Sequence, residues 1–398
     1  MTTAVIVDAV RTAGGKRNGK LSGWHPVDLA AETLKALVQR NDIDPALIED
    51  VIMGCVMQVG AQGANVARNA ALAAGFPEDV VGTTIDRQCG SSQQAAHFAA
   101  QGVMAGAYDV VVAAGVEVMS LVPMGASMMV PNVGAPFGET VMKRYEPVGG
   151  LQPQGIGAEM IADKWGLSRE DLDRFGAESQ QRAERATAEG RFEREIIPVA
   201  GKHKDKETGK VVDLGEEVTA DEGIRPGTTA ETLANLKPAF KPDGKVTAGN
   251  SSQITDGASA ALIMSEEKAS QLGLTPRARF HSFALAGVDP VTMLTGPIPA
   301  TRKIFEKSKL GMDDIDAVEI NEAFASVVLA WEKEHHPDMT KVNPNGGAIA
   351  LGHPLGASGT KLLASLLNEL ERTSGRYGLL TMCEGGGMAN ATIIERLG

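Results

Sequence analysis

The chain has 398 residues, more than a single hydrophobic core usually serves, so we expect two or more packed units. Its 43% hydrophobic residues and 46 glycines are typical of a globular protein rich in turns. The net charge of -12 argues against a general nucleic-acid or anionic-membrane surface, because both attract basic proteins. A small anionic ligand would need only a local group of basic residues.

The three cysteines, Cys55, Cys89 and Cys383, are too few and too irregularly spaced for a disulfide framework, and they fit a reducing cytosol. No apolar run approaches ~18 residues, and the first apolar stretch precedes a basic one, the reverse of a signal peptide. The C-terminal residues carry no Ser-Lys-Leu peroxisomal address. We therefore expect a soluble, cytoplasmic protein that does not associate with membranes.

The N-terminal third alternates strand-like apolar runs with amphipathic, helix-like stretches. This alternation favours an α/β architecture with largely buried sheets. The predicted strands cover residues 4–10, 50–57 and 81–85, and the predicted helices cover residues 25–38 and 64–74.

The segment after Cys89 predicts a helix over residues 91–106, with serines as possible caps, and then a buried strand over residues 109–120. The C-terminal part has the same order, with a helix over residues 353–373 and a strand over residues 377–387 that carries Cys383. Pattern rather than residue identity indicates this weak duplication. Two similar halves facing each other would bring their loops together.

Residues 120–252 differ in character from both flanks. They contain a Met-, Pro- and Gly-rich stretch, a charged helical stretch over residues 167–192 and a polar hairpin over residues 201–218. We interpret the segment as an insertion carried on the first half. An ordinary solvated subdomain would show the same charge pattern.

Cys89 lies in DRQCGSSQQA, directly before a predicted helix. A free thiol is mostly protonated at neutral pH, and the positive end of a helix dipole or a nearby imidazole would stabilise its thiolate. A buried structural cysteine is the alternative. Residues 90–94 look unsuited to a core, so we favour a nucleophile.

Three further residues could take part in the same chemistry. His353, in GGAIALGHPLGASG, can accept a thiol proton and donate a hydrogen bond to an oxyanion near neutral pH, although a lone histidine is more often structural. Cys383, in MCEGGGMANA, would reach a sheet edge, or it could be a packed residue. Asn321, in NEAFAS, precedes a helix expected to begin around Glu322, so a helix cap is its alternative role.

Taken together, these four motifs resemble the thiolase family, and the match runs nearly end to end. The resemblance implies an α/β thiolase fold of two similar αβαβα halves, layered, with an inserted loop domain. The first half would be residues 1–119, completed by residues 253–275. The loop domain would be residues 120–252 and would bind coenzyme A (CoA), and the second half would be residues 276–398.

The resemblance also implies a role for each residue. Cys89 would hold the acyl group as a thioester, and Cys383 would be the acid and base at the α-carbon. His353 and a water oriented by Asn321 would bind the enolate oxygen. The backbone N–H of Gly385, with that of Cys89, would form an oxyanion hole.

For CoA, the resemblance assigns Arg225 to the nucleotide end, where a cation suits phosphate. It assigns Ser252 and Ala248 to the pantetheine arm and Phe324 to the channel. Each could instead be ordinary turn, surface or core chemistry. The chain has no GxxxxGK[ST] phosphate loop, and we expect no metal and no tightly bound cofactor, only CoA and acyl-CoA as substrates.

Two departures bear on the substrate. Ser92 stands where the family usually has glycine, and residues 153–155 read Pro-Gln-Gly where short-chain biosynthetic members carry His-Met-Gly. We therefore expect degradative cleavage of 3-oxoacyl-CoA to acetyl-CoA and a shortened acyl-CoA. Similarity to actinobacterial thiolases for steroid-derived acyl-CoAs points the same way, and a short-chain acetoacetyl-CoA thiolase is the alternative.

Two other classes make different predictions. A ketosynthase shares the fold but would normally replace Cys383 by histidine. A non-catalytic acyl-CoA-binding protein would be expected to lose at least one of the four residues. The resemblance further implies a homodimer or homotetramer, with residues 54–75 at a subunit contact and Cys55 structural.

Overall fold

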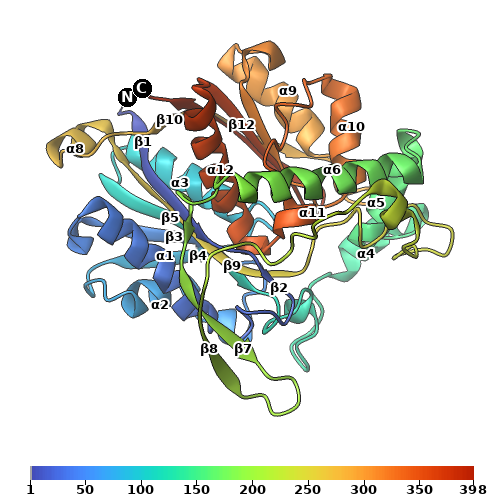
Figure 1. The fold of residues 1–398 in the computed structure, drawn as a ribbon, viewed down its shortest axis with the longest axis horizontal. Helices are drawn as coiled ribbons and strands as arrows, with labels where there is room; N and C mark the ends of the chain where they lie inside the picture. Colours follow the sequence, from blue (N-terminus) through green and yellow to red (C-terminus); the bar gives the residue numbers. More distant parts are fainter. Residues whose placement is uncertain (1) are drawn as a thin grey trace.

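The computed structural model describes residues 2–398 as one large sheet, one separate hairpin and helices on several layers (Figure 1). The strands are β1 (Ala4–Thr12), β2 (Gly15–Lys16), β3 (Asp50–Gly54), β4 (Val81–Ile85), β5 (Val110–Val118), β6 (Ile196–Ile197), β7 (Val199–Lys204), β8 (Val211–Val218), β9 (Thr255–Ser265), β10 (Ala278–Gly287), β11 (Ala317–Ile320), β12 (Tyr377–Glu384) and β13 (Met388–Arg396). The α-helices are α1 (Pro26–Asn41), α2 (Val66–Ala73), α3 (Ser91–Met104), α4 (Glu139–Tyr145), α5 (Gln154–Lys164), α6 (Arg169–Ala188), α7 (Ala230–Ala234), α8 (Glu266–Gln271), α9 (Pro297–Ser308), α10 (Ala325–His335), α11 (Ala348–Leu351) and α12 (Ser358–Thr373).

The large sheet contains the same strand arrangement twice. Its order is β11-β12-β13-β10-β1-β9-β5-β3-β4, and β6 and β2 pair at the side with β1 and β9. In each half a parallel pair, β3 with β5 or β11 with β12, is followed by two antiparallel pairings that end at β1 or β10. The two halves then meet where β1 and β10 pair antiparallel. The duplication that the sequence indicated is therefore present, and the α/β, two-half fold class is confirmed.

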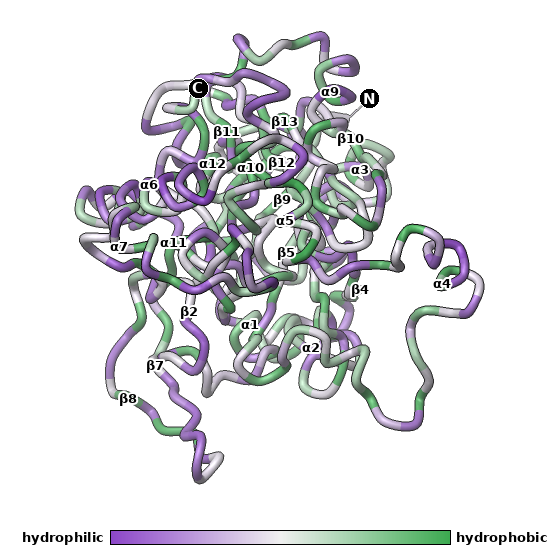
Figure 2. The backbone as a smooth tube through the Cα atoms, turned by 90° about the vertical axis from the view of Figure 1, so that its right-hand side faces the viewer, coloured by the Kyte–Doolittle hydropathy of each residue, from purple (hydrophilic) through white to green (hydrophobic). Residues whose placement is uncertain are grey.

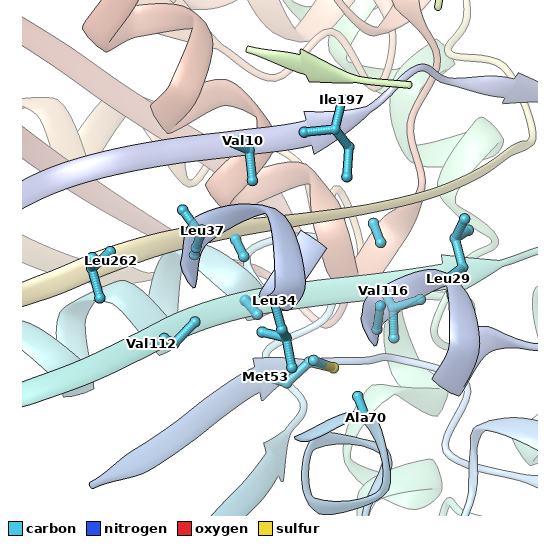
Figure 3. Packing of buried hydrophobic residues seen from close by; sticks show 14 of the residues in the cluster. Val10, Leu29, Leu34, Leu37, Met53, Ala70, Val112, Val116, Ile197 and Leu262 are labelled. Carbon is cyan, nitrogen blue, oxygen red and sulfur yellow. The ribbon is translucent and has the colours of Figure 1, made fainter. Parts of the chain in front are cut away.

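Three clusters of buried apolar side chains fill the space between the layers. Strand β5 is largely apolar on both faces because both faces are buried. Its even-numbered residues pack toward α1 and α2, while Val111 and Ala113 pack toward α3 and α12. Figure 3 shows Leu34 and Leu37 of α1 close to Val112 of β5 in the first cluster. The third cluster joins α9 and α10 to the strands of the C-terminal half.

Helices α3 and α12 occupy the central layer, and their backbones approach closely. A Cβ added at Gly359 would lie 2.0 Å from the backbone nitrogen of Gln93. The Oγ of Ser92 accepts a hydrogen bond from the Thr360 N–H at 3.0 Å, and Gln93 Nε2 donates to Thr392 Oγ1 at 2.7 Å. The expectation that residues 90–94 are unsuited to a core is therefore wrong, since small and polar groups are what this helix crossing buries.

Most predicted elements are confirmed within a few residues, and two helix starts are not. The helix expected around Glu322 begins at Ala325, because Phe324 is extended and bridges to Ser251, and Ser252 N–H donates to Ala323 O at 2.9 Å. The helix expected from His353 begins at Ser358. The serines after Cys89 are not caps, because the N-cap of α3 is Gly90.

The inserted segment contains the elements that project from the body. Figure 2 shows the hairpin of β7 and β8 and the arm around α4 extending away from it on opposite sides. Helix α6 instead lies against the body and carries the charged stretch predicted as helical. No helix within residues 2–398 has the length and apolar character needed to cross a membrane. The three-part domain division remains a prediction.

Candidate active site

Cys89 lies in a tight turn between β4 and α3. The turn requires a left-handed backbone at Gln88, with φ of 48°, and the Gln88 N–H donates to Asp86 Oδ1 at 2.6 Å. Asn390 of β13 donates to Gly90 O at 3.0 Å from the other side. Contacts from both halves of the sheet therefore fix the position of the Cys89 side chain, which is buried.

The second cysteine reaches the same place from the end of β12. Burial raises the pKa of Cys89, and the nearby Cys383 and Glu384 act in the same direction. Hydrogen bonding from the backbone N–H groups of Gly385 and of Cys89 itself opposes this rise. Burial also raises the pKa of Cys383 to about 12. Both thiols are therefore protonated at neutral pH, so the expected thiolate at the helix N-terminus is not the resting state.

The two backbone N–H groups that face the Cys89 sulfur come from different elements. One is the N–H of Cys89 itself, just before α3, and the other is the N–H of Gly385, in the turn between β12 and β13. Donors held by the backbone on either side of a nucleophile suit the stabilisation of an oxyanion that forms there. The structure thus brings the Gly385 N–H to Cys89.

His353 is buried and held by three hydrogen bonds. Its backbone N–H donates to Thr255 Oγ1 at 3.0 Å and to Gln253 O at 3.3 Å, and Nδ1 lies 2.5 Å from Ser358 Oγ. Because the Ser358 hydroxyl donates to Pro354 O at 2.8 Å, it accepts from Nδ1, which assigns the ring proton to Nδ1.

The other ring nitrogen of His353, Nε2, has no partner among residues 2–398. Burial lowers the pKa of His353 to about 3, and the charge of Lys361 acts in the same direction. The imidazole is therefore neutral at physiological pH. Its Nε2 has a free lone pair that can accept a proton.

Asn321 follows β11 and lies beside Cys383. Its backbone N–H donates to Thr381 O at 3.1 Å, and its Nδ2 lies 3.8 Å from Cys383 Sγ. The Oδ1 atom is buried and has no partner in the described part of the chain. The alternative reading of Asn321 as a helix cap is wrong, because α10 starts at Ala325 after Phe324.

Of the four residues predicted to contact CoA, two lie beside this group. Ser252 contacts the Asn321 loop through the backbone, and Phe324 packs edge-on against Phe240 with ring centroids 5.9 Å apart. Ala248 is exposed on the segment that leads to Ser252. Arg225 is exposed near α6, and no hydrogen bond or ion pair within residues 2–398 joins its side chain to the two cysteines.

Buried carboxylates that the sequence analysis missed hold the loops of the site. Glu117 of β5 accepts hydrogen bonds from the N–H groups of Val56 at 2.9 Å and Gly356 at 2.9 Å, which ties the His353 loop to the N-terminal half. Glu322 accepts from Ser179 Oγ at 2.6 Å and from Asn343 Nδ2 at 2.9 Å. The sequence signal for these carboxylates was a charged residue inside an apolar stretch, but their hydrogen-bond partners are remote in sequence.

Glu384 is a third missed carboxyl group, directly after Cys383. Neither of its oxygens has a hydrogen-bond partner in residues 2–398, and a Cβ added at Gly90 would lie 2.1 Å from Oε1. Burial raises the pKa of Glu384 to about 8. At neutral pH it is therefore a neutral acid that adds little charge near the thiols.

A polar surface cavity of about 520 Å³ lies elsewhere, between α6 and α12. Its arginines are largely paired, Arg182 with Glu178 and Arg372 with Glu369. It contains none of the predicted site residues.

Two family models cover nearly the whole chain: "Thiolase, N-terminal domain" matches residues 4–267, and "Thiolase, C-terminal domain" matches residues 274–396. Among relatives, the steroid 3-ketoacyl-CoA thiolase FadA6 of Mycobacterium tuberculosis is 53% identical, over 100% of this chain and 95% of that protein. A 3-ketoacyl-CoA thiolase of Idiomarina loihiensis is 45% identical over the full length of both chains. The crystal structure of the Bacillus anthracis acetyl-CoA acetyltransferase superposes with a TM-score of 0.89 at 42% identity, covering 100% of this chain and 99% of that one.

Proposed function

Since the chain belongs to the thiolase family, we propose that Cys89 is the nucleophile in the CoA-dependent cleavage of a 3-oxoacyl-CoA. The protein is an acyltransferase of the 3-ketoacyl-CoA thiolase type, which the thiolase resemblance of the sequence predicted. One observation carries the assignment of roles. Two buried thiols and the backbone N–H groups of Cys89 and Gly385 lie together, Asn321 lies beside Cys383, and we assign the unpartnered Nε2 of His353 to the same site.

In the first step, His353 Nε2 takes the proton of the Cys89 thiol while the sulfur attacks the C3 carbonyl carbon. The N–H groups of Cys89 and Gly385 stabilise the resulting oxyanion. When the oxyanion collapses, the bond between C2 and C3 breaks. The acyl group stays on Cys89, and acetyl-CoA leaves as its enolate.

In the second step, the enolate is protonated at C2 by the Cys383 thiol, which becomes a thiolate. The unpartnered Oδ1 of Asn321 is available to orient a water at the enolate oxygen. Free CoA then gives its thiol proton to Cys383 and attacks the acyl-Cys89 thioester. The proton held by His353 returns to Cys89, so every group regains its starting state.

We assign CoA to the segment that contains Ala248 and Ser252, to Phe324, and, at its nucleotide end, to Arg225. Ser252 and Phe324 support this because they adjoin the Asn321 loop. CoA and acyl-CoA are substrates in this scheme, with no tightly bound cofactor.

For the acyl group, we propose a degradative 3-oxoacyl-CoA of greater bulk than acetoacetyl-CoA, in keeping with the 53% identity to the steroid thiolase. Ser92 is buried at the contact of α3 with α12, so its departure from glycine acts on helix packing. Gly155 lies against Phe240, where a Cβ would be 2.1 Å from the ring. The Pro-Gln-Gly segment therefore adjoins, through the glycine that it shares with His-Met-Gly, the aromatic pair beside the site.

We further propose a cytoplasmic homodimer or homotetramer. All three cysteines are free. Strand β4 lies at one end of the sheet, where it pairs with β3 alone among the strands of residues 2–398, and Val81 is 54% exposed. An open sheet edge of this kind suits pairing with a second copy.

The roles of the two cysteines can be separated by experiment. Acyl transfer from a saturated acyl-CoA to Cys89 needs no proton at C2, whereas cleavage of a 3-oxoacyl-CoA does. We expect Cys383→Ser to lose cleavage far more than acyl transfer, because the CoA thiolate released in acyl transfer is a weaker base than an enolate and depends less on a proton from Cys383, and we expect Cys89→Ala to lose both. Equal loss of both activities in Cys383→Ser would contradict the assignment. Activity with acetoacetyl-CoA alone would replace the bulky-substrate proposal by the short-chain alternative.

A further inference from the structure

We propose that Lys361 is a positioning residue for His353, which it holds in place through the backbone carbonyls of Leu351 and Gly352. Lys361 touches neither cysteine nor the expected substrate position. The inference rests on the proposed role of His353 as the base.

The geometry of the contact is direct. Lys361 lies in the first turn of α12, and its Nζ is buried and donates to Leu351 O at 2.7 Å and to Gly352 O at 2.8 Å. These two residues immediately precede His353. Gly352 has a φ of 79°, and a Cβ there would lie 2.3 Å from Thr255 Oγ1. One ammonium group therefore fixes two successive carbonyls of the loop that carries the imidazole.

The ammonium group is unusual because no carboxylate lies within 4.0 Å of it in the described chain. Burying a charge without a contact partner is costly unless other charges compensate at longer range. The compensation is a buried group in which Arg11 contacts Glu195 at 2.7 Å and Asp221 at 2.7 Å. This group has one negative charge in excess, which the charge on Lys361 balances.

The same buried group fastens α12 to β1, the strand that carries Arg11. Glu195 accepts a hydrogen bond from Ser365 Oγ at 2.9 Å, one turn after Lys361. It also lies 3.4 Å from Asn368 Nδ2, on the following turn. The helix is thus anchored on one side, and Lys361 extends that anchor to the His353 loop.

The charged groups around Lys361 make the contact sensitive to pH. Burial lowers the pKa of Lys361 to about 8, Asp221, Glu195 and Glu319 oppose this effect, and Arg11 adds to it. The charge of Lys361 in turn disfavours the imidazolium form of His353. The contact to the two carbonyls should therefore weaken as the pH rises through about 8.

Loss of activity in that range would not reflect unfolding caused by Lys361. Its pKa is lower in the folded chain than in the unfolded chain, so the unfolded state binds more protons between the two values. The contribution of Lys361 to stability therefore increases with pH across that window, while the loop contact is lost.

Three variants test the proposal. Lys361→Met removes the charge and the donors at similar length, and Lys361→Arg keeps both but does not titrate. Ser365→Ala is the matched control, because it loses a hydrogen bond of the same buried group without touching the loop. For each we would measure the melting temperature, kcat for thiolysis against pH, and the acyl-Cys89 peptide mass.

We expect Lys361→Met to lower kcat by about tenfold to a hundredfold, the cost of a misplaced catalytic group. Its acid limb should shift to higher pH, because His353 becomes easier to protonate. Lys361→Arg should keep much of the activity and move the alkaline limb upward. Ser365→Ala should melt earlier with an unchanged pH profile.

The proposal would be overturned if kcat of Lys361→Met had the same pH profile as the wild type. It would also be overturned if Lys361→Met and Ser365→Ala lowered kcat by the same small factor. If Lys361→Met does not fold, the proposal would instead be overturned by an unchanged alkaline limb in the kcat–pH profile of Lys361→Arg. His353→Ala separates the two levels of the account. If it forms acyl-Cys89 at the wild-type rate, the proposed role of His353 as the base fails; if it does not, only the role of Lys361 is in question.

Discussion

The hydroxyl group of Ser358 should determine which nitrogen of His353 can act as a base. In Ser358→Ala the Nδ1–H group would be buried without an acceptor, which costs about 1–3 kcal/mol. The ring can avoid this cost by moving its proton to Nε2, where it blocks proton transfer from Cys89. If the full cost appears in the barrier, kcat falls by roughly five- to 150-fold.

The assay is steady-state thiolysis of a 3-oxoacyl-CoA at saturating CoA. Ser259→Ala is the matched control, because the Ser259 hydroxyl is also buried at the start of α12 and donates to Ala357 O at 2.6 Å without contacting His353. Both variants should lose about 1 kcal/mol of folding free energy, but only Ser358→Ala should lose kcat. A kcat within about twofold of the wild type in Ser358→Ala, or an equal loss in both variants, would refute the reasoning.

Three other outcomes follow from the contacts described. Gly359→Ala should lower the melting temperature strongly, since a Cβ there would lie 2.0 Å from the Gln93 nitrogen, and overpacking costs about 1–3 kcal/mol; an unchanged melting temperature would show that the helices separate easily. Gly155→Ala should displace the half-exposed Phe240 ring. Steady-state kinetics should then show a higher KM for CoA substrates, and thermal melting should show little loss of stability. An unchanged KM would exclude this ring from the binding path. Alkylation of Cys89 by iodoacetamide should accelerate as the pH rises through the alkaline range, because burial raises the pKa of the thiol, and a rate independent of pH would indicate a preformed thiolate.

The sequence was sufficient to predict the two-half α/β fold class and the family. Largely apolar strands such as β5 and the repeated order of loop, helix and strand indicated two similar halves, which the structure joins edge to edge in one sheet through β1 and β10. The motifs around Cys89, His353, Cys383 and Asn321 indicated the chemistry, and the thiolase membership of the chain is confirmed.

Long-range contacts explain what the sequence did not predict. The late start of α10 depends on the contacts of Ala323 and Phe324 with Ser252 and Ser251, which override the local helix preference. Glu117 accepts a hydrogen bond from Gly356, which lies 239 positions later in the sequence. Its role in holding the His353 loop therefore has no local sequence signature. The same is true of Lys361, which reads as an ordinary exposed lysine of an amphipathic helix until its burial is known.

The resting protonation states also depended on three-dimensional burial. A cysteine before a helix suggests a thiolate, but complete burial and the nearby Cys383 reverse that expectation. In the proposed mechanism, the neutral resting forms of Cys89 and His353 mean that proton transfer accompanies substrate attack instead of preceding it.

The most direct test of the central claim is the peptide-resolved mass of the protein after brief exposure to a 3-oxoacyl-CoA without added CoA. The account predicts an acyl group on the Cys89 peptide that disappears when CoA is supplied and is absent in Cys89→Ala. Release of acetyl-CoA with the acyl group on Cys383, or with no acyl group on any cysteine, would contradict it.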